Sequence, residues 1–262
     1  MNITPPNRLH QPGVYSPSGV PPGIELTTVA GPIDGPPVLI ATMHGKERVL
    51  GPQLSALGFR VVLPVGYDTD KLGTFSGDVR RPGTAREAAL EKARRVCDVT
   101  GIPRAVASEG SYRPCQKQFP GARNVELLAF VDREVGIEIV ECMINAPTSF
   151  VKGRVPPNVD APEVQALLGA MGWPDVRALV VPNDPGQGVM PGLVFKGIGH
   201  EADLAAAFSA CAAASDDGWV HLETDLRAHM NPTRMVSVSL IGERLALRLR
   251  HEGFRMPMAA AA

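Results

Sequence analysis

The sequence has none of the cysteine or charge patterns that would assign it to a specialised class of protein. Its four cysteines (Cys97, Cys115, Cys142 and Cys211) are widely scattered and include no Cys-x-x-Cys pair. This spacing argues against a zinc ribbon and against a disulfide scaffold. Lys and Arg (26) almost balance Asp and Glu (27), giving a formal net charge of −1. The chain therefore has no bulk basic field that would recruit nucleic acid or an anionic membrane.

Long hydrophobic runs are also missing. No apolar run reaches the length of a transmembrane helix, and the N-terminus has no basic-then-apolar signal pattern. The alanine-rich segment 204–214 is short and is broken by Ser209, so it predicts a packed helix. With the scattered cysteines, these features predict a soluble protein of the reducing cytoplasm. At 262 residues the chain can bury a sizeable core.

Composition divides the chain into three regions. Residues 1–37 are dense in proline and glycine and are predicted to be a flexible leader, although the sequence allows an edge strand at 24–29. Residues 38–253 alternate between short aliphatic runs and helical patterns, which predicts a single α/β domain. Residues 254–262 are predicted to be a disordered tail.

The order of these runs and patterns predicts the fold class. We expect strands at 38–40, 59–63, 104–108, 125–131, 136–145, 178–181, 193–196 and 219–224. Helices are expected from 46, with Pro52 as a kink or a start, and then at 84–99, from 160, at 201–214 and from 231. The strands 125–131 and 136–145 are joined by a short turn and predict a hairpin. The predicted fold is α/β, with a mixed, mainly parallel sheet flanked by helices and an antiparallel hairpin beside it.

The segment 41–47 (ATMHGKE), which follows the first predicted strand, predicts an anion site. A strand that ends in small and polar residues and gives way at once to a helix aims backbone N–H groups at one point. The connection 64–83 is long and carries Asp68, Asp70 and Asp78. Loops of that length are uncommon unless they bind something or are disordered.

Two glutamates further along are candidate ligands. Thr84 and Glu87 have the spacing of a capping box, and Glu87 lies at i, i+4 to Glu91, a like-charge pair that costs roughly 0.2–0.5 kcal/mol. Glu87 is therefore either part of a cap on a solvated helix face or a ligand for a cation. Glu109 comes just past the predicted strand 104–108 and is followed by Gly110. Open α/β sheets place ligands at such strand ends.

A group of cations is predicted at the start of the last helix. Asn231 followed by Pro232 is typical of a helix N-terminus. Arg227, His229 and Arg234 cluster around it, where the helix dipole favours anions. The alternative is a set of surface cations paired with nearby acidic residues.

Four motifs in the sequence resemble an uncharacterised bacterial family, a domain of unknown function. These motifs are Thr42-Met43-His44-Gly45-Lys46-Glu47, the segment 68–77 (DTDKLGTFSG), the segment 107–111 (ASEGS), and the segment 223–235 (ETDLRAHMNPTRM). The resemblance covers the chain from Val38 to about Leu249. Members of that family continue into a cysteine-rich segment resembling a zinc ribbon, where this sequence has Arg255-Met256-Pro257-Met258 and alanines.

The pattern Thr84-x-x-Glu87-x-Ala89-Leu90-x-Lys92-Ala93, followed by Gly101-Ile102-Pro103 and a strand ending in acid-Gly, is similar to a second group. This group is the house-cleaning nucleoside triphosphate pyrophosphatases, inosine triphosphatase-like enzymes and their Maf-like relatives. The resemblance implies an inosine triphosphatase-like fold. It also implies phosphate binding by Thr42, His44, Lys46 and Lys92, and magnesium on Glu87 and Glu109, which would be the catalytic acids. Here His44 replaces the usual asparagine, Ala88 replaces another, and the double aspartate is reduced to Ser108-Glu109.

If this second resemblance holds, it implies a mechanism. Lys46 and Lys92 would neutralise a triphosphate, and Mg²⁺ would activate water for attack at the α–β linkage. Arg227, His229 and Arg234 would lie near the base or ribose. Two alternatives remain: a non-catalytic nucleotide or phosphometabolite sensor, and a partner-binding adaptor that uses the long loop. The expected partners are a small phosphate-bearing molecule and no membrane, with a homodimer left open.

Overall fold

The computed structural model describes residues 20–42, 44–67, 83–114, 122–145, 148–183 and 192–254. Its strands are β1 (Glu25–Ala30), β2 (Pro37–Ala41), β3 (Arg60–Val65), β4 (Arg104–Pro114), β5 (Ala122–Asp132), β6 (Ile137–Asn145), β7 (Lys152–Val155), β8 (Ala178–Pro182), β9 (Phe195–Ile198) and β10 (Val220–Thr224). Its α-helices are α1 (Glu47–Ser55), α2 (Ala85–Thr100), α3 (Pro162–Met171), α4 (Glu201–Ala213) and α5 (Pro232–His251), with a 3-10 turn η2 (Ala228–Met230) before α5.

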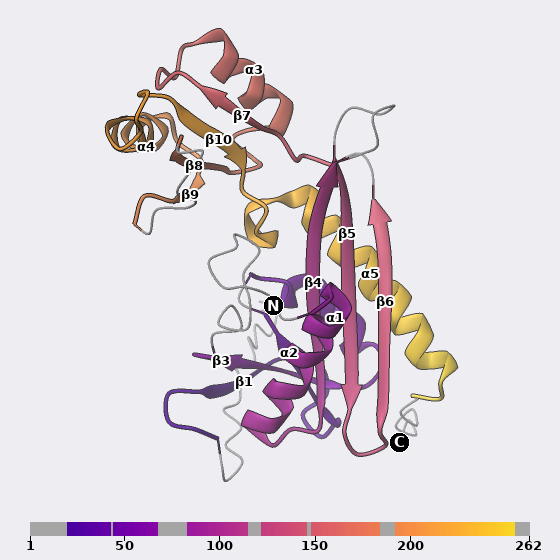
Figure 1. Ribbon diagram of the computed structural model, residues 1–262. Helices are drawn as coiled ribbons and strands as arrows, with labels where there is room; N and C mark the ends of the chain where they lie inside the picture. The colour runs from indigo at the N-terminus through magenta and orange to yellow at the C-terminus, as the bar shows by residue number, and fades with distance from the viewer. Residues whose placement is uncertain are drawn as a thin grey trace, which may run out of the picture.

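The first sheet has six strands in the order β1-β3-β2-β4-β5-β6 (Figure 1). The prediction of a mixed sheet flanked by helices is confirmed, but the prediction that it is mainly parallel is wrong. Only the β2–β3 and β2–β4 pairs are parallel, whereas β1–β3, β4–β5 and β5–β6 are antiparallel. The reason is that β4 does not end at Ser108 but continues to Pro114 and pairs along its whole length with β5. The predicted hairpin is the β5–β6 pair.

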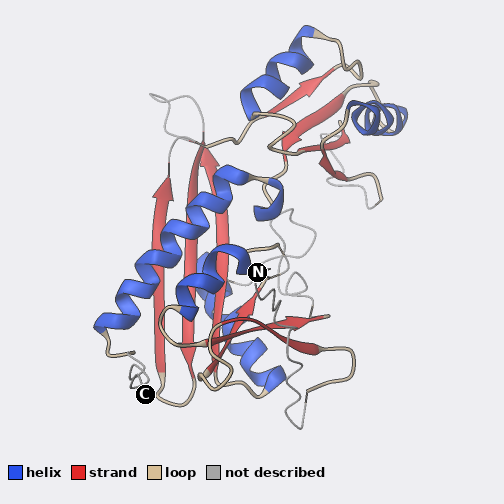
Figure 2. Cartoon of the chain, turned by 180° about the vertical axis from the view of Figure 1, so that it is seen from behind, coloured by secondary structure: helices blue, strands red, loops and turns tan. Residues whose placement is uncertain are grey.

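Helices cover both faces of this sheet (Figures 1 and 2). On one face, α1 and α5 pack on the even-numbered residues of β4 and β5, such as Val106, Leu128 and Phe130. On the other face, α2 packs on the odd-numbered residues, such as Ala107 and Ala129. Successive side chains of a strand point to opposite faces, so neighbouring residues of β4 serve different layers.

The second sheet is smaller and entirely antiparallel, in the order β7-β10-β8-β9. With α3 and α4 it encloses a separate apolar core. This part, residues 152–224, is inserted between β6 and α5 and stands to one side of the first sheet (Figure 1). The two connecting segments meet where Asn231 Nδ2 donates to Ser149 Oγ at 2.9 Å and to the Asp225 carbonyl at 3.5 Å.

Two cap patterns read from the sequence are confirmed, whereas the capping box expected at 160–163 does not form, because Ala161 is the N-cap residue of α3 and makes no side-chain cap hydrogen bond. Thr84 and Glu87 form a reciprocal capping box on α2, and Asn231 caps α5 by accepting from the Arg234 N–H at 3.0 Å. Pro52 lies inside α1. The strand allowed at 24–29 is β1, which pairs with β3, while residues 1–19 and 255–262 lie outside the described residues. Within the described part, no helix has both the length and the hydrophobicity needed to span a bilayer.

Candidate functional site

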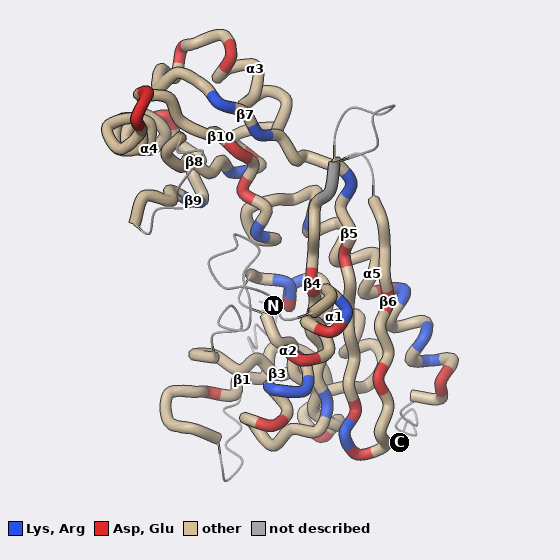
Figure 3. The backbone as a smooth tube through the Cα atoms, viewed as in Figure 1, with Lys and Arg blue, Asp and Glu red and all other residues tan. Residues whose placement is uncertain are grey.

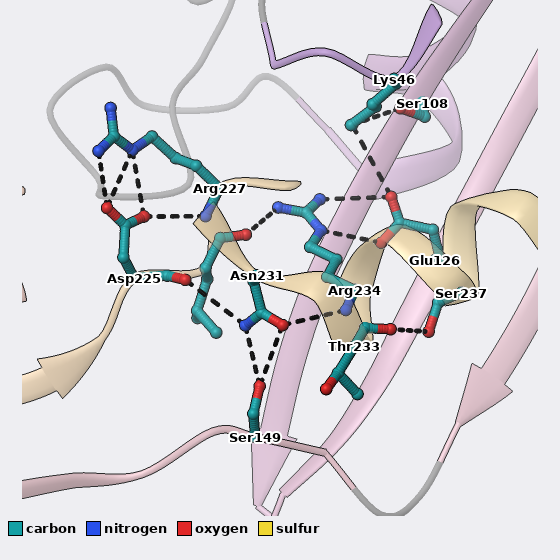
Figure 4. A network of polar contacts seen from close by, with 11 residues as sticks. Lys46, Ser108, Glu126, Ser149, Asp225, Arg227, Asn231, Thr233, Arg234 and Ser237 are labelled. Atoms are coloured by element: carbon teal, nitrogen blue, oxygen red, sulfur yellow. Dashed lines mark hydrogen bonds and ion pairs between the residues drawn. The ribbon is translucent and has the colours of Figure 1, made fainter. Parts of the chain in front are cut away.

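A buried network of charges joins the starts of α1 and α5 to the first sheet (Figure 4). We call Lys46, Ser108, Glu126 and Arg234 the Glu126 network. Lys46 Nζ donates to Ser108 Oγ at 2.5 Å and lies 3.9 Å from Glu126 Oε1. Arg234 donates through Nε and Nη2 to the two oxygens of Glu126, at 3.2 and 3.3 Å. The Glu126 side chain is fully buried, so its charge is held by protein groups rather than by water.

Local sequence explains how each member of the network is positioned. Lys46 is the N-cap residue of α1, and Arg234 lies in the first turn of α5, three residues after the Asn231 cap. On the sheet, Glu126 lies opposite Gly110. A Cβ atom on Gly110 would be 2.2 Å from Arg234 Nη2 and 2.6 Å from Glu126 Oε2. Glycine at this position therefore gives the ion pair room to lie on the backbone of β4.

The Glu126 network contains more positive than negative charge. Lys46 and Arg234 share one carboxylate, and the first turns of two helices, whose dipoles are positive at that end, lie beside them. Burial and then the neighbouring Arg234 lower the pKa of Lys46 to about 8, against the opposing effects of Glu126 and Glu109. The resulting positive potential would stabilise an anion bound beside the network.

Two histidines lie next to this network and closer to solvent. The rings of His44 and His229 stack with centroids 5.2 Å apart and planes inclined by 21°. They come from the β2–α1 loop and from η2, and a Cβ atom on Gly45 would lie 3.5 Å from the His229 Cβ, so the two segments are in contact. Partial burial lowers the pKa of His229, and the neighbouring His44 and Arg227 lower it further.

The other predicted residues of this group serve their own segments. Thr42 Oγ1 accepts from the His44 N–H at 3.1 Å and so shapes the loop. Arg227 Nη2 donates to the buried carboxylate of Asp225 at 2.7 Å, as the alternative reading of the cation cluster expected. Asp225 Oδ2 also accepts from the Gly197 N–H at 2.9 Å. The charge of Arg227 is therefore partly neutralised by Asp225. The exposed Arg48 is a further cation near His229 and also lowers the pKa of that ring.

Lys92 and Glu109 form a separate buried pair on the α2 side of the sheet. Glu109 was expected beyond the end of its strand, but it lies within β4, because the strand continues to Pro114. Its side chain points away from that of Ser108, since the two residues are neighbours on one strand. The predicted phosphate ligands Lys46 and Lys92 thus lie on opposite faces of the sheet.

Glu87 lies apart from both groups. Its carboxylate accepts from the Thr84 N–H at 2.6 Å, and these bonds from Thr84 hold the pKa of Glu87 below its usual value. Glu91 pairs with Arg95, four residues further along the helix, at 2.6 Å. The two predicted magnesium ligands are each held by another group. Within the described ranges, no three His, Cys, Asp or Glu side chains are placed to hold a metal ion, and Asp68, Asp70 and Asp78 lie outside those ranges.

Sequence reasoning missed Glu126, the centre of the network. The signal was present, because Glu126 shares the even-numbered face of β5 with Leu128 and Phe130, which belong to the core. A charged residue at an inward position of an apolar strand requires a partner. Asn124 has the same phase and is also buried. The partners themselves, from residues 46 and 234, could not be read from spacing.

Comparison with known proteins gives a family and no function. A family model described as a domain of unknown function, DUF6671, matches residues 92–253. The matched region includes Glu109, Glu126 and Arg234 and begins after the β2–α1 loop. No curated protein and no solved structure matches the chain, so nothing among them supports the resemblance to nucleoside triphosphate pyrophosphatases.

Proposed function

The chain belongs to the DUF6671 family of domains of unknown function, and we propose that it binds a small phosphate-bearing anion, such as a nucleotide, between the β2–α1 loop and the start of α5. The observation that carries this proposal is the shared carboxylate. Lys46 and Arg234 both depend on Glu126, so one buried positive charge has no acidic partner of its own in the network. An anion would supply the missing negative charge.

The solvent-facing groups suit a phosphate. His229 and Arg48 are exposed and His44 is half-buried, so all three are accessible from outside. The first turn of α1 adds the positive end of its helix dipole, while its Arg48 and Val49 N–H groups donate to the carbonyls of Gly45 and Lys46. Phosphate oxygens accept several hydrogen bonds and interact favourably with helix N-termini. An anion beside His229 would oppose the lowering of that ring's pKa and favour its protonated form.

Isothermal titration calorimetry tests this proposal. We would titrate inorganic phosphate, AMP, ADP and ATP, each with and without Mg²⁺, into the purified protein. A charge-assisted hydrogen bond contributes about 1.5–3 kcal/mol, and 1.4 kcal/mol is about tenfold in Kd. We therefore expect His229→Gln to weaken binding by about tenfold or more. His251→Gln, on the exposed end of α5, is the matched control and should leave the Kd unchanged. Equal affinity in both variants would refute the assignment.

Magnesium-dependent hydrolysis of a nucleoside triphosphate is the second candidate. It rests on the sequence resemblance to nucleoside triphosphate pyrophosphatases, and Glu109 lies near enough to Lys46 to raise its pKa. The acidic residues within the described ranges do not by themselves form the metal site that this candidate needs. Pyrophosphate release from ATP and ITP, compared between wild type and Glu109→Gln, tests it. If the protein neither binds a phosphate compound nor releases pyrophosphate, the result would favour the partner-binding adaptor.

A further inference from the structure

The shortest contact of the Glu126 network joins a serine hydroxyl to a lysine amine. Lys46 Nζ lies 2.5 Å from Ser108 Oγ, and both residues are buried, with 5% and 8% of their surface exposed. Ser108 is fixed by the antiparallel ladder between β4 and β5, and Lys46 by the start of α1. A serine hydroxyl is a weak nucleophile unless a base lies within hydrogen-bond reach of it.

The charges around Lys46 suit an amine that gives up its proton. With Lys46 protonated, the network holds two positive charges and one negative charge. With Lys46 neutral, Glu126 and Arg234 balance each other. The same burial and the same Arg234 lower the pKa of Lys46 to about 8, so roughly a tenth of the molecules carry a neutral amine at pH 7.

The Arg234 guanidinium lies over Gly110, two residues after Ser108 on β4. Gly110 shares the face of Ser108 on β4, and its missing side chain lets Arg234 Nη2 lie over the strand. A guanidinium in a buried setting stabilises negative charge that develops during a reaction. Ser108, Lys46 and Arg234 thus provide a hydroxyl, a base beside it and a neighbouring cation.

We propose that Ser108 is a nucleophile with Lys46 as its general base, and that the site transfers the acyl group of a carboxylic ester to water. Ser108 Oγ forms a bond to the carbonyl carbon while its proton passes to Lys46 Nζ. The tetrahedral species then breaks the bond to the alcohol oxygen, which takes that proton from Nζ. Water attacks the acyl-serine, its proton passes to Nζ, and the departing Ser108 Oγ recovers it. This activity goes beyond anion binding and does not depend on it.

A fluorophosphonate probe tests the inference, because Ser Oγ displaces fluoride and forms a stable bond to phosphorus. Peptide mass spectrometry of the labelled full-length protein should find the adduct on Ser108. The labelling rate should rise with pH, with a midpoint near the Lys46 pKa of about 8. This measurement on the unaltered protein needs no variant to fold. Labelling elsewhere in the protein, or none at pH 9, would overturn the inference.

Variants separate a base from a structural cation. Arginine keeps the charge and the hydrogen bond but cannot accept a proton, so Lys46→Arg should label more than about a hundredfold more slowly. Ser237→Ala is the control, because Ser237 is also buried but donates to the Thr233 carbonyl, and its rate should match wild type. Lys46→Arg labelling at the wild-type rate would refute the role of Lys46. The calorimetric titration reports on anion binding separately, so either proposal can fail alone.

Discussion

The two sheets of this protein bury different kinds of residue. The layers on the two faces of the first sheet bury charged side chains, among them Lys46, Lys92, Glu109, Glu126 and Arg234. In the inserted part, the described residues between 152 and 224 bury only two polar side chains, Asn183 and Thr224, and no charged one. Acidic and basic residues are otherwise interspersed along both parts of the chain (Figure 3). The difference therefore lies in the interior and not in overall composition.

This contrast indicates where chemistry resides. Buried charges are costly, and replacing a buried pair by packed apolar residues is often neutral or stabilising. A core that keeps several of them therefore needs a reason other than stability. The inserted part has the interior of an ordinary scaffold, and its two connections run past the Glu126 network through Ser149, Asp225 and Asn231. We infer that the first sheet carries the site and that the insert frames it.

The largest expected effect follows from removing the shared carboxylate. Glu126→Gln removes the carboxylate that two buried cations share and should lower the free energy of unfolding by about 3–5 kcal/mol. Phosphate or ATP should raise the Tm of this variant more than that of wild type, because the anion replaces the lost charge. Chemical denaturation and thermal shift measure both effects. Glu138→Gln, which breaks a partly exposed pair with Arg94, is the control and should cost about 0–1 kcal/mol. A Glu126→Gln variant as stable as this control would remove the contrast between the two cores.

A matched loss in the other core should have a different consequence. Phe208 of α4 is fully buried in the apolar cluster of the insert. Phe208→Ala should cost about 3–5 kcal/mol through the cavity it leaves. Below the temperature of unfolding, calorimetry should give an unchanged affinity for the anion. Ser209→Ala, on the exposed side of the same helix, should change neither quantity. A loss of affinity in Phe208→Ala would mean that the insert belongs to the site.

Local signals predicted the local structure of both parts. The Thr84–Glu87 spacing gave the start of α2, Asn231-Pro232 gave the start of α5, and the short turn after Asp132 gave the hairpin. Each is decided by neighbours within four residues. Strand pairing is decided by residues far apart, which is why β4 was expected to end at Ser108 beside parallel neighbours.

The candidate site was predictable only in part, because the sequence indicates local structure but not contacts between distant residues. The β2–α1 loop and the cations before α5 were expected to bind an anion, and they lie together at the His44–His229 stack. The pairing of Lys92 with Glu109 on the opposite face follows from the phase of β4. That phase could be counted from the sequence only once the true length of the strand was known. Glu126 contacts Lys46, which lies 80 positions before it in the sequence, and Arg234, which lies 108 positions after it. No local sequence pattern indicates such contacts.

A smaller loss of stability should show whether Glu87 only caps α2 or also binds a metal ion. Thr84→Ala removes the side-chain half of the capping box on α2 and should cost about 1 kcal/mol, within a range of about 0.5–2 kcal/mol. Glu87→Gln should also lower the Tm. Neither variant should change anion affinity with or without Mg²⁺, because Glu87 is occupied by the cap. Glu91→Gln, on the same helix, is the control for a lost surface charge. A magnesium-dependent loss confined to Glu87→Gln would restore the magnesium ligand that the sequence suggested.

The smallest expected effect is a pH dependence that should appear only in the charged part. The pKa of His229 is lowered in the folded protein, by partial burial and then by His44 and Arg227. Below pH 6.5 the unfolded chain therefore binds more protons at this position than the folded one, and stability falls as the pH drops. The Tm of wild type should decline more steeply between pH 7.5 and pH 5 than that of His229→Gln. His221→Gln, on β10 of the insert, should decline as wild type does. Parallel curves for wild type and His229→Gln would show that the stacked rings do not oppose protonation, and a main reason to place positive potential at this end of the sheet would be lost.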